Sequence, residues 1–105
     1  MTTVDLSSLR SLLGDDETLV QRFIGIFKNQ TPEMLAQIRD GLDKMDWENA
    51  SIAAHSLKSQ CRYFGLEALA AMAESIENNP AAAETKSLFS DLEKHLTTVL
   101  NALGE

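Results

Sequence analysis

The residue of this sequence best suited to chemistry is His55, which lies in the segment AAHSLK at residues 53–58. A neutral imidazole that stands in solvent is a nucleophile open to a partner protein. Lys58 follows three residues later, which is one turn along the same face of a helix. A base beside a nucleophile favours a site that binds an anion such as phosphate.

The periodicity around His55 predicts that it faces solvent. On one side of a helix over residues 47–64 lie the apolar or small residues Ala50, Ala53, Leu57, Cys61 and Phe64. His55 falls at about 140° from Ala50 on the helical wheel, nearly opposite that side. It shares its own side with Ser51, Lys58, Ser59 and Arg62.

Charge distribution supports a site on this face. The chain has a formal net charge of −7, yet residues 49–66 contain Lys58 and Arg62 and no acid. We therefore expect a small cationic island around His55, with Ser51 and Ser59 small enough to let a bulky partner approach. A single exposed histidine is most often an ordinary surface residue, and only its coincidence with these neighbours favours a function.

Composition excludes several classes of protein. The length of 105 residues predicts one domain over 1–105, and the single Cys61 excludes an internal disulfide and a cysteine-based zinc cluster. The acidic charge argues against binding of nucleic acid or anionic lipid. No signal peptide or apolar run of about 18 residues is present, so we expect a cytoplasmic protein. Without a glycine-rich phosphate loop or clustered metal ligands, we expect no ATP site, no metal and no cofactor of its own.

Apolar residues recur at three and four positions throughout, which predicts an all-α fold. The expected helices cover about 6–13, 16–44, 47–64, 66–77 and 82–103, with Asp5 and Asp46 as N-caps and Gly14 and Gly65 as terminators. Four of them should form an antiparallel up-down-up-down bundle that the short first helix caps.

The second helix contains Pro32, which we expect to kink it on the solvent side without ending it. Its predicted apolar stripe comprises Leu19, Phe23, Phe27, Met34, Ile38, Leu42 and Met45. In the third helix, Ile52 and Tyr63 fall toward the His55 side. They are either covered by the first helix or form the apolar part of a docking patch.

The letters H-x-L-K at 55–58, followed by Gly65 ten residues after the histidine, resemble the signature of the histidine-containing phosphotransfer (HPt) domain family. The long preceding helix with its internal proline, the pair Asp46-Trp47 and the start Gly65-Leu66-x-x-Leu69 extend the resemblance over nearly the whole chain. One position departs from the pattern, because the family usually has Gly after the Lys and this chain has Ser59.

The resemblance implies a monomeric phosphoryl carrier. His55 would accept a phosphoryl group through Nε2 from an aspartyl phosphate on a receiver domain and pass it to another receiver Asp. The partners would be receiver domains of a hybrid sensor kinase or of response regulators, and Mg²⁺ would belong to the receiver. Lys58 would stabilise the phosphoryl charge. The position that orients the imidazole through Nδ1 in the family corresponds to Glu77, which is otherwise a flanking residue near a helix end.

In the phosphotransfer interpretation, the residues expected to contact the partner are Ser51, Ile52, Ser59, Arg62 and Tyr63. The alternative function is a non-catalytic helical interaction module, such as an adaptor or chaperone, in which His55 is incidental. His55→Gln separates the two, because it leaves an adaptor's binding intact and abolishes phosphoryl acceptance. A metal-dependent hydrolase is disfavoured, since His55 and His95 have no supporting acids at ligand spacing.

Overall fold

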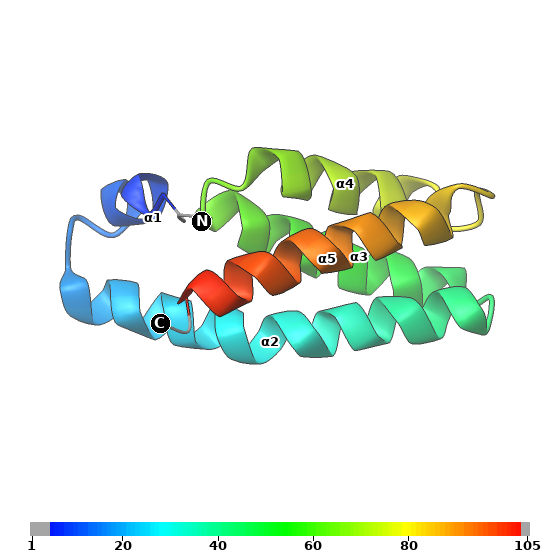
Figure 1. Ribbon diagram of the computed structural model, residues 1–105, viewed down its shortest axis with the longest axis horizontal. Coiled ribbons are helices and arrows are strands. Elements are labelled where there is room, and N and C mark those ends of the chain that lie inside the picture. Colours follow the sequence, from blue (N-terminus) through cyan, green and yellow to red (C-terminus); the bar gives the residue numbers. More distant parts are fainter. Residues whose placement is uncertain (1–4, 104–105) are drawn as a thin grey trace.

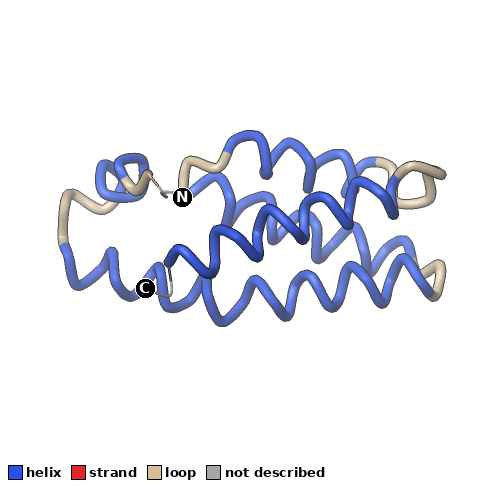
Figure 2. The backbone as a smooth tube through the Cα atoms, viewed as in Figure 1, coloured by secondary structure: helices blue, strands red, loops and turns tan. Residues whose placement is uncertain are grey.

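The computed structural model describes residues 5–103, and every regular element in that range is an α-helix (Figures 1 and 2). The helices are α1 (Ser7–Leu12), α2 (Glu17–Asp43), α3 (Trp47–Tyr63), α4 (Glu67–Asn78) and α5 (Thr85–Leu103). The last four alternate in direction, and α1 lies at the end of the bundle where α3 turns into α4 (Figure 1). The predicted all-α bundle is confirmed, and the largest boundary difference is the start of α5, expected at residue 82.

Aspartates begin two of the long helices. The side chain of Asp16 accepts hydrogen bonds from the N–H groups of Thr18 and Leu19 at the start of α2. Asp46 accepts from the N–H of Asn49 at the start of α3, as predicted. These bonds satisfy backbone donors that have no partner inside the helix. Asp5 was expected to cap α1, but the N-cap is Leu6, and Asp5 instead accepts from the N–H of the first helical residue.

Gly65 reverses the chain between α3 and α4. Gly65 ends α3 as predicted, and its φ of +71° is left-handed. The N–H of Leu66 donates to the carbonyl of Cys61, and the N–H of Gly65 donates to that of Arg62. This is the Schellman arrangement that ends a helix abruptly. A Cβ at Gly65 would also lie 2.8 Å from Ser8 Oγ, so α1 leaves no room for a side chain there.

The buried stripe of α2 differs from the predicted one. Its buried positions are Val20, Ile24, Phe27, Thr31, Leu35, Ile38, Gly41 and Leu42. Leu19, Phe23 and Met34 are only partly buried, and Met45 lies exposed beyond the helix end with a φ of +58°. The stripe is rotated because α2 packs against both α3 and α5, so the line between those two helices sets its buried side.

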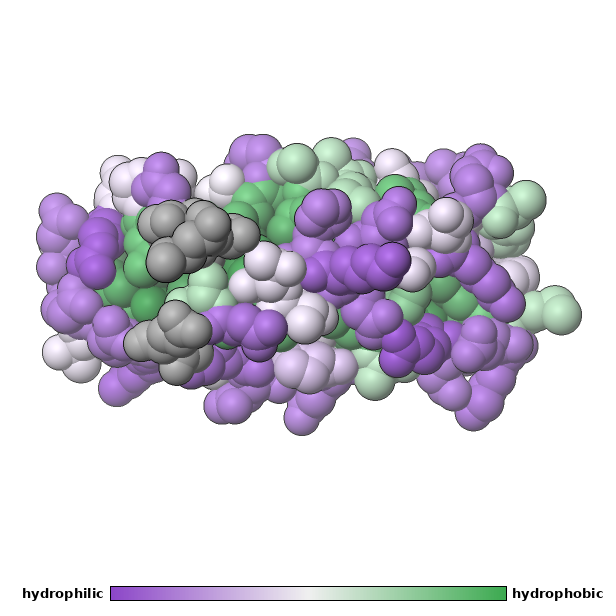
Figure 3. Space-filling model, viewed as in Figure 1, coloured by the Kyte–Doolittle hydropathy of each residue, from purple (hydrophilic) through white to green (hydrophobic). Residues whose placement is uncertain are grey.

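Two features let α2 serve as one long support for α3. The helix continues through Pro32, which is exposed, so water can satisfy the carbonyl that loses its N–H partner. Near its other end, Gly41 lets α3 approach closely, since a Cβ there would lie 2.9 Å from Ala50 Cβ. Polar side chains cover most of the face formed by α2 and α5 (Figure 3).

Candidate functional site

Helices α3 and α4 bring three side chains together around His55. Nδ1 of His55 lies 2.8 Å from Oε2 of Glu77, and Nζ of Lys58 donates to the other carboxylate oxygen, Oε1, at 2.7 Å. His55 and Lys58 share a face because they are three residues apart on α3. Glu77 comes from the last turn of α4, which returns along α3 after the Gly65 turn. One carboxylate thus contacts two basic side chains.

The three side chains differ sharply in exposure. The His55 side chain is 60 % exposed, as the helical wheel predicts, whereas that of Glu77 is 22 % exposed and that of Lys58 only 13 %. The helical wheel places Lys58 on the solvent-facing side with His55, and this prediction is wrong, because the Lys58 side chain is largely covered. It lies between α3 and α4 because its ammonium group reaches the partly buried carboxylate and its methylene stem is covered.

The charge state of Glu77 determines what the imidazole can do. The hydrogen bond from Lys58 holds the pKa of Glu77 below its ordinary value, and the contact with His55 adds to this while partial burial opposes it. An ionised carboxylate can only accept hydrogen bonds. A neutral imidazole bonded to it through Nδ1 must therefore carry its proton on Nδ1. The lone pair of Nε2 is then free for attack on an electrophile.

The predicted cationic island is corrected by the acids of α4. Arg62 donates to Glu74 at 3.0 Å, just as Lys58 donates to Glu77. The sequence segment around His55 has no acid, but the segment that packs against it does. Glu74 and Glu77 are three residues apart, so they lie on one face of α4. Lys58 and Arg62 are four residues apart and share a face of α3 in the same way. Two bases on one helix and two acids at similar spacing on the next helix are the sequence signal that could have predicted these pairs.

The two serines that flank His55 behave differently. Oγ of Ser51 donates to the backbone carbonyl of Glu77 at 2.8 Å, whereas Oγ of Ser59 donates to the backbone carbonyl of His55 itself at 3.3 Å. Ser51 therefore connects α3 with α4, and Ser59 remains within α3. Both are small, as the sequence requires for close approach to the ring.

Apolar surface lies beside His55 on the side of α2. Ile52 and Tyr63 are exposed, so α1 does not cover them. The ring of Tyr63 packs edge-on against Phe23, with their centroids 6.3 Å apart. An open groove of about 450 Å³ runs between α1, α2 and α3; it is lined by Leu12, Leu13, Phe23, Ile26, Gln30, Gln60 and Tyr63.

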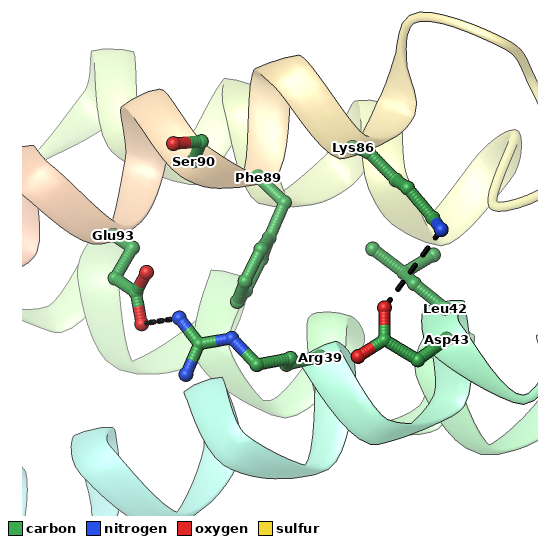
Figure 4. A pocket seen from close by; sticks show the side chains of 7 residues that line it. All are labelled: Arg39, Leu42, Asp43, Lys86, Phe89, Ser90 and Glu93. Atoms are coloured by element: carbon green, nitrogen blue, oxygen red, sulfur yellow. Dashed lines mark hydrogen bonds and ion pairs between the residues drawn. The ribbon is translucent and has the colours of Figure 1, made fainter.

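The remaining candidate residues lie apart from this site. Cys61 is buried, and burial raises the pKa of its thiol to about 12, so it packs as a small apolar residue. His95 is exposed on α5. Within residues 5–103, no three His, Cys, Asp or Glu side chains are grouped as a metal site would need. A second open pocket, between α2 and α5, is lined by Arg39, Phe89 and Glu93 among others (Figure 4).

A protein-family model described as the Hpt domain matches residues 22–104. The chain belongs to the Hpt domain family. The match includes all of α3, α4 and α5 and most of α2, and it begins after α1. Neither the comparison with curated proteins nor the comparison with solved structures gave a match.

Family membership has consequences for the coarse function. Hpt domains carry out histidine phosphotransfer in phosphorelays, as phosphoryl carriers that interact with receiver domains. His55 is the histidine in the H-x-L-K motif of this Hpt domain. None of the described helices combines the length and apolar character needed to cross a membrane.

Proposed function

We propose that this Hpt domain accepts a phosphoryl group on Nε2 of His55 from the aspartyl phosphate of a receiver domain and passes it to the Asp of a response regulator. The observation that carries the proposal is the 2.8 Å contact between His55 Nδ1 and Glu77 on an otherwise exposed ring. It supports a ring oriented through one nitrogen and reactive through the other. His95 has no such carboxylate contact among the described residues.

The transfer step balances without a cofactor on this chain. The Nε2 lone pair attacks phosphorus, the N–P bond forms, and the P–O bond to the receiver carboxylate breaks with its electrons remaining on that carboxylate. The ring becomes a phosphorylated imidazolium that keeps its proton on Nδ1, and this N–H donates a hydrogen bond to the Glu77 carboxylate. The negative carboxylate thus opposes the positive charge that develops on the ring. Mg²⁺ would be held by the receiver, which supplies the charge stabilisation at phosphorus.

Two roles of Lys58 are distinguished in this scheme. Its sequence position favours direct stabilisation of the phosphoryl charge. Its contact with Glu77 supports a second role, in which Lys58 keeps the carboxylate ionised and oriented toward the ring. We propose the second role for the resting protein, because the ammonium group is largely covered and already bonded.

Receiver docking is proposed on the face that surrounds His55. Exposed Ile52 and Tyr63 offer apolar contacts beside the ring, and Ser59 and Arg62 form its polar border. The apolar groove at α1 continues this surface from Tyr63. An apolar centre with a polar rim is the usual composition of a transient protein interface. The domain would act as a monomer in the cytoplasm.

The test is phosphoryl transfer from a radiolabelled, phosphorylated receiver domain with Mg²⁺ present. His55→Gln is compared with wild type and with His95→Gln, which removes the other histidine from an exposed position. We expect acid-labile, alkali-stable label on wild type and on His95→Gln, and none on His55→Gln. Circular dichroism confirms that each variant remains folded.

Two results would contradict the proposal. Label that persists in His55→Gln would identify another acceptor. Failure of the folded wild type to take label from a panel of receivers would favour the adaptor function, in which the same face binds a partner without phosphoryl transfer.

A further inference from the structure

Ser51 makes the hydrogen bond that joins α3 to the end of α4. Its hydroxyl donates to the backbone carbonyl of Glu77 at 2.8 Å, and it lies four residues before His55 on the same face of α3. The bond therefore reaches the main chain of the residue whose side chain contacts the imidazole. It is part-buried, so solvent competes with it less than at an open surface.

The carbonyl of Glu77 needs a partner from outside its helix. Helix α4 ends at Asn78, so Glu77 lies in the last turn, where carbonyl groups have no N–H four residues ahead within the helix. The segment Asn79-Pro80 follows, and Pro80 has no N–H to offer. Last turns of helices fray readily. Glu77 thus lies at the part of α4 that is least held by its own backbone.

The hydroxyl of a helical serine ordinarily bonds a carbonyl one turn back in its own helix. Ser59 does this, since it donates to the carbonyl of His55 four residues earlier. Ser51 instead donates across the helix pair. The two residues share a type, a helix and a face, and they differ in whether their hydroxyl bonds anything on α4.

We propose that Ser51 is a positioning residue: it holds the backbone of Glu77 so that the carboxylate stays on His55 Nδ1. Ser51 acts through Glu77 and not by touching the phosphoryl group or the receiver. Its effect on phosphoryl transfer rests on the proposed function, but its effect on the imidazole does not. The structure thus gives Ser51 a different role from the partner contact that its sequence position predicts.

The test measures the tautomer of His55 and the initial rate of phosphoryl transfer in the same set of variants. Ser51→Ala removes the hydroxyl, Ser51→Thr keeps it, and Ser59→Ala is the matched control for the tautomer, because its hydroxyl bonds within α3. The tautomer is read from the ring ¹⁵N chemical shifts at a pH where the imidazole is neutral. Ser51→Cys, which retains the side-chain size with a weaker donor, serves the same purpose if the alanine variant does not fold.

For Ser51→Ala we expect a smaller fraction of the Nδ1–H tautomer and transfer slower by roughly threefold to tenfold, the equivalent of one ordinary hydrogen bond. Ser51→Cys should fall between it and wild type. Ser51→Thr should match wild type in both measurements, and Ser59→Ala should keep the wild-type tautomer.

An unchanged tautomer in folded Ser51→Ala overturns the proposal, and it does so even if transfer slows, since Ser51 would then act as a partner contact. A tautomer shift of the same size in Ser59→Ala also overturns it, because the effect would not depend on the bond to α4. A shift of the His55 tautomer that occurs in Ser51→Ala and not in Ser59→Ala supports the positioning role. If the wild-type protein also takes no label from any receiver, the proposed function is contradicted and the positioning role is not.

Discussion

Two faces of this bundle carry ion pairs between neighbouring helices, and they are built differently. On the α2–α5 face each cation has its own acid: Arg39 pairs with Glu93, and Lys86 lies 3.8 Å from Asp43 (Figure 4). The Arg39 guanidinium also lies 5.5 Å from the centre of the Phe89 ring. On the α3–α4 face, His55 and Lys58 share the single carboxylate of Glu77.

The lysines on the two faces differ in how far they are buried, and this difference follows from their carboxylate partners. Lys86 is 68 % exposed at its side chain and Lys58 only 13 %. Exposed pairs are screened by water and salt and contribute little to stability. A partly buried carboxylate between two bases is screened less, so it fixes both a protonation state and a geometry. Similar residue types thus connect helices on the α2–α5 face and orient the imidazole of His55 on the α3–α4 face.

The largest expected difference between the faces is in stability. Glu77→Ala leaves the covered Lys58 ammonium without its partner, and we expect the free energy of unfolding to fall by about 2 kcal/mol, between the values typical of exposed and of buried pairs. Glu93→Ala removes the more exposed pair with Arg39 and should cost less than about 1 kcal/mol. Urea denaturation of both variants measures these changes in the free energy of unfolding. Equal losses in Glu77→Ala and Glu93→Ala would contradict the expected difference between the two faces.

A double-mutant cycle tests how Lys58 acts. Lys58→Met keeps the length of the side chain and removes its charge, and we expect transfer to slow by roughly tenfold to a hundredfold, the equivalent of one hydrogen bond to a charged group. In a Glu77→Gln background the same change should have little effect, because Lys58 acts through the carboxylate.

An equal loss in both backgrounds would instead indicate that Lys58 stabilises the phosphoryl group directly, as its place in the sequence motif predicts. Lys86→Met is the matched control on the other face, and its transfer rate should equal that of wild type.

A smaller effect concerns the pH dependence of stability. Lys58 and His55 hold the pKa of Glu77 below its ordinary value of 4.5. Because the unfolded chain then binds the proton more tightly, Glu77 stabilises the fold above about pH 4.5, and this contribution is lost as the pH falls through the lower folded pKa. The difference in unfolding free energy between wild type and Glu77→Gln should therefore shrink below about pH 4.5. A difference that stays constant from neutral to acidic pH would contradict this.

Local signals in the sequence were sufficient for much of the fold. Caps such as Asp46 and the glycine at 65 act within one turn of chain, so helix ends can be predicted from them. The exposure of His55 follows from the apolar positions of its own helix. Both depend only on residues close together in the sequence.

The features that local sequence patterns do not predict depend on how one helix packs against another. The helical wheel of α3 predicts a solvated Lys58 because it contains only residues of α3. It cannot include Glu77 of α4, whose carboxylate binds the Lys58 ammonium group. The buried stripe of α2 includes Thr31, whose hydroxyl has no hydrogen-bond partner among the described residues. A polar residue at that position is not a core signal. Its burial results from the rotation of α2 between α3 and α5, which local periodicity specifies only approximately.

The abrupt turn at Gly65 has a consequence for how the length of this chain can change. His55 and Glu77 are 22 positions apart in sequence, and the chain between them is helix except at that turn. One residue inserted between Leu66 and Glu77 would rotate the carboxylate by about 100° and advance it by about 1.5 Å, away from the imidazole. The connection after α4 sets no such spacing. A change of chain length between α4 and α5 therefore leaves the His55–Glu77 contact in place, whereas one between His55 and Glu77 breaks it.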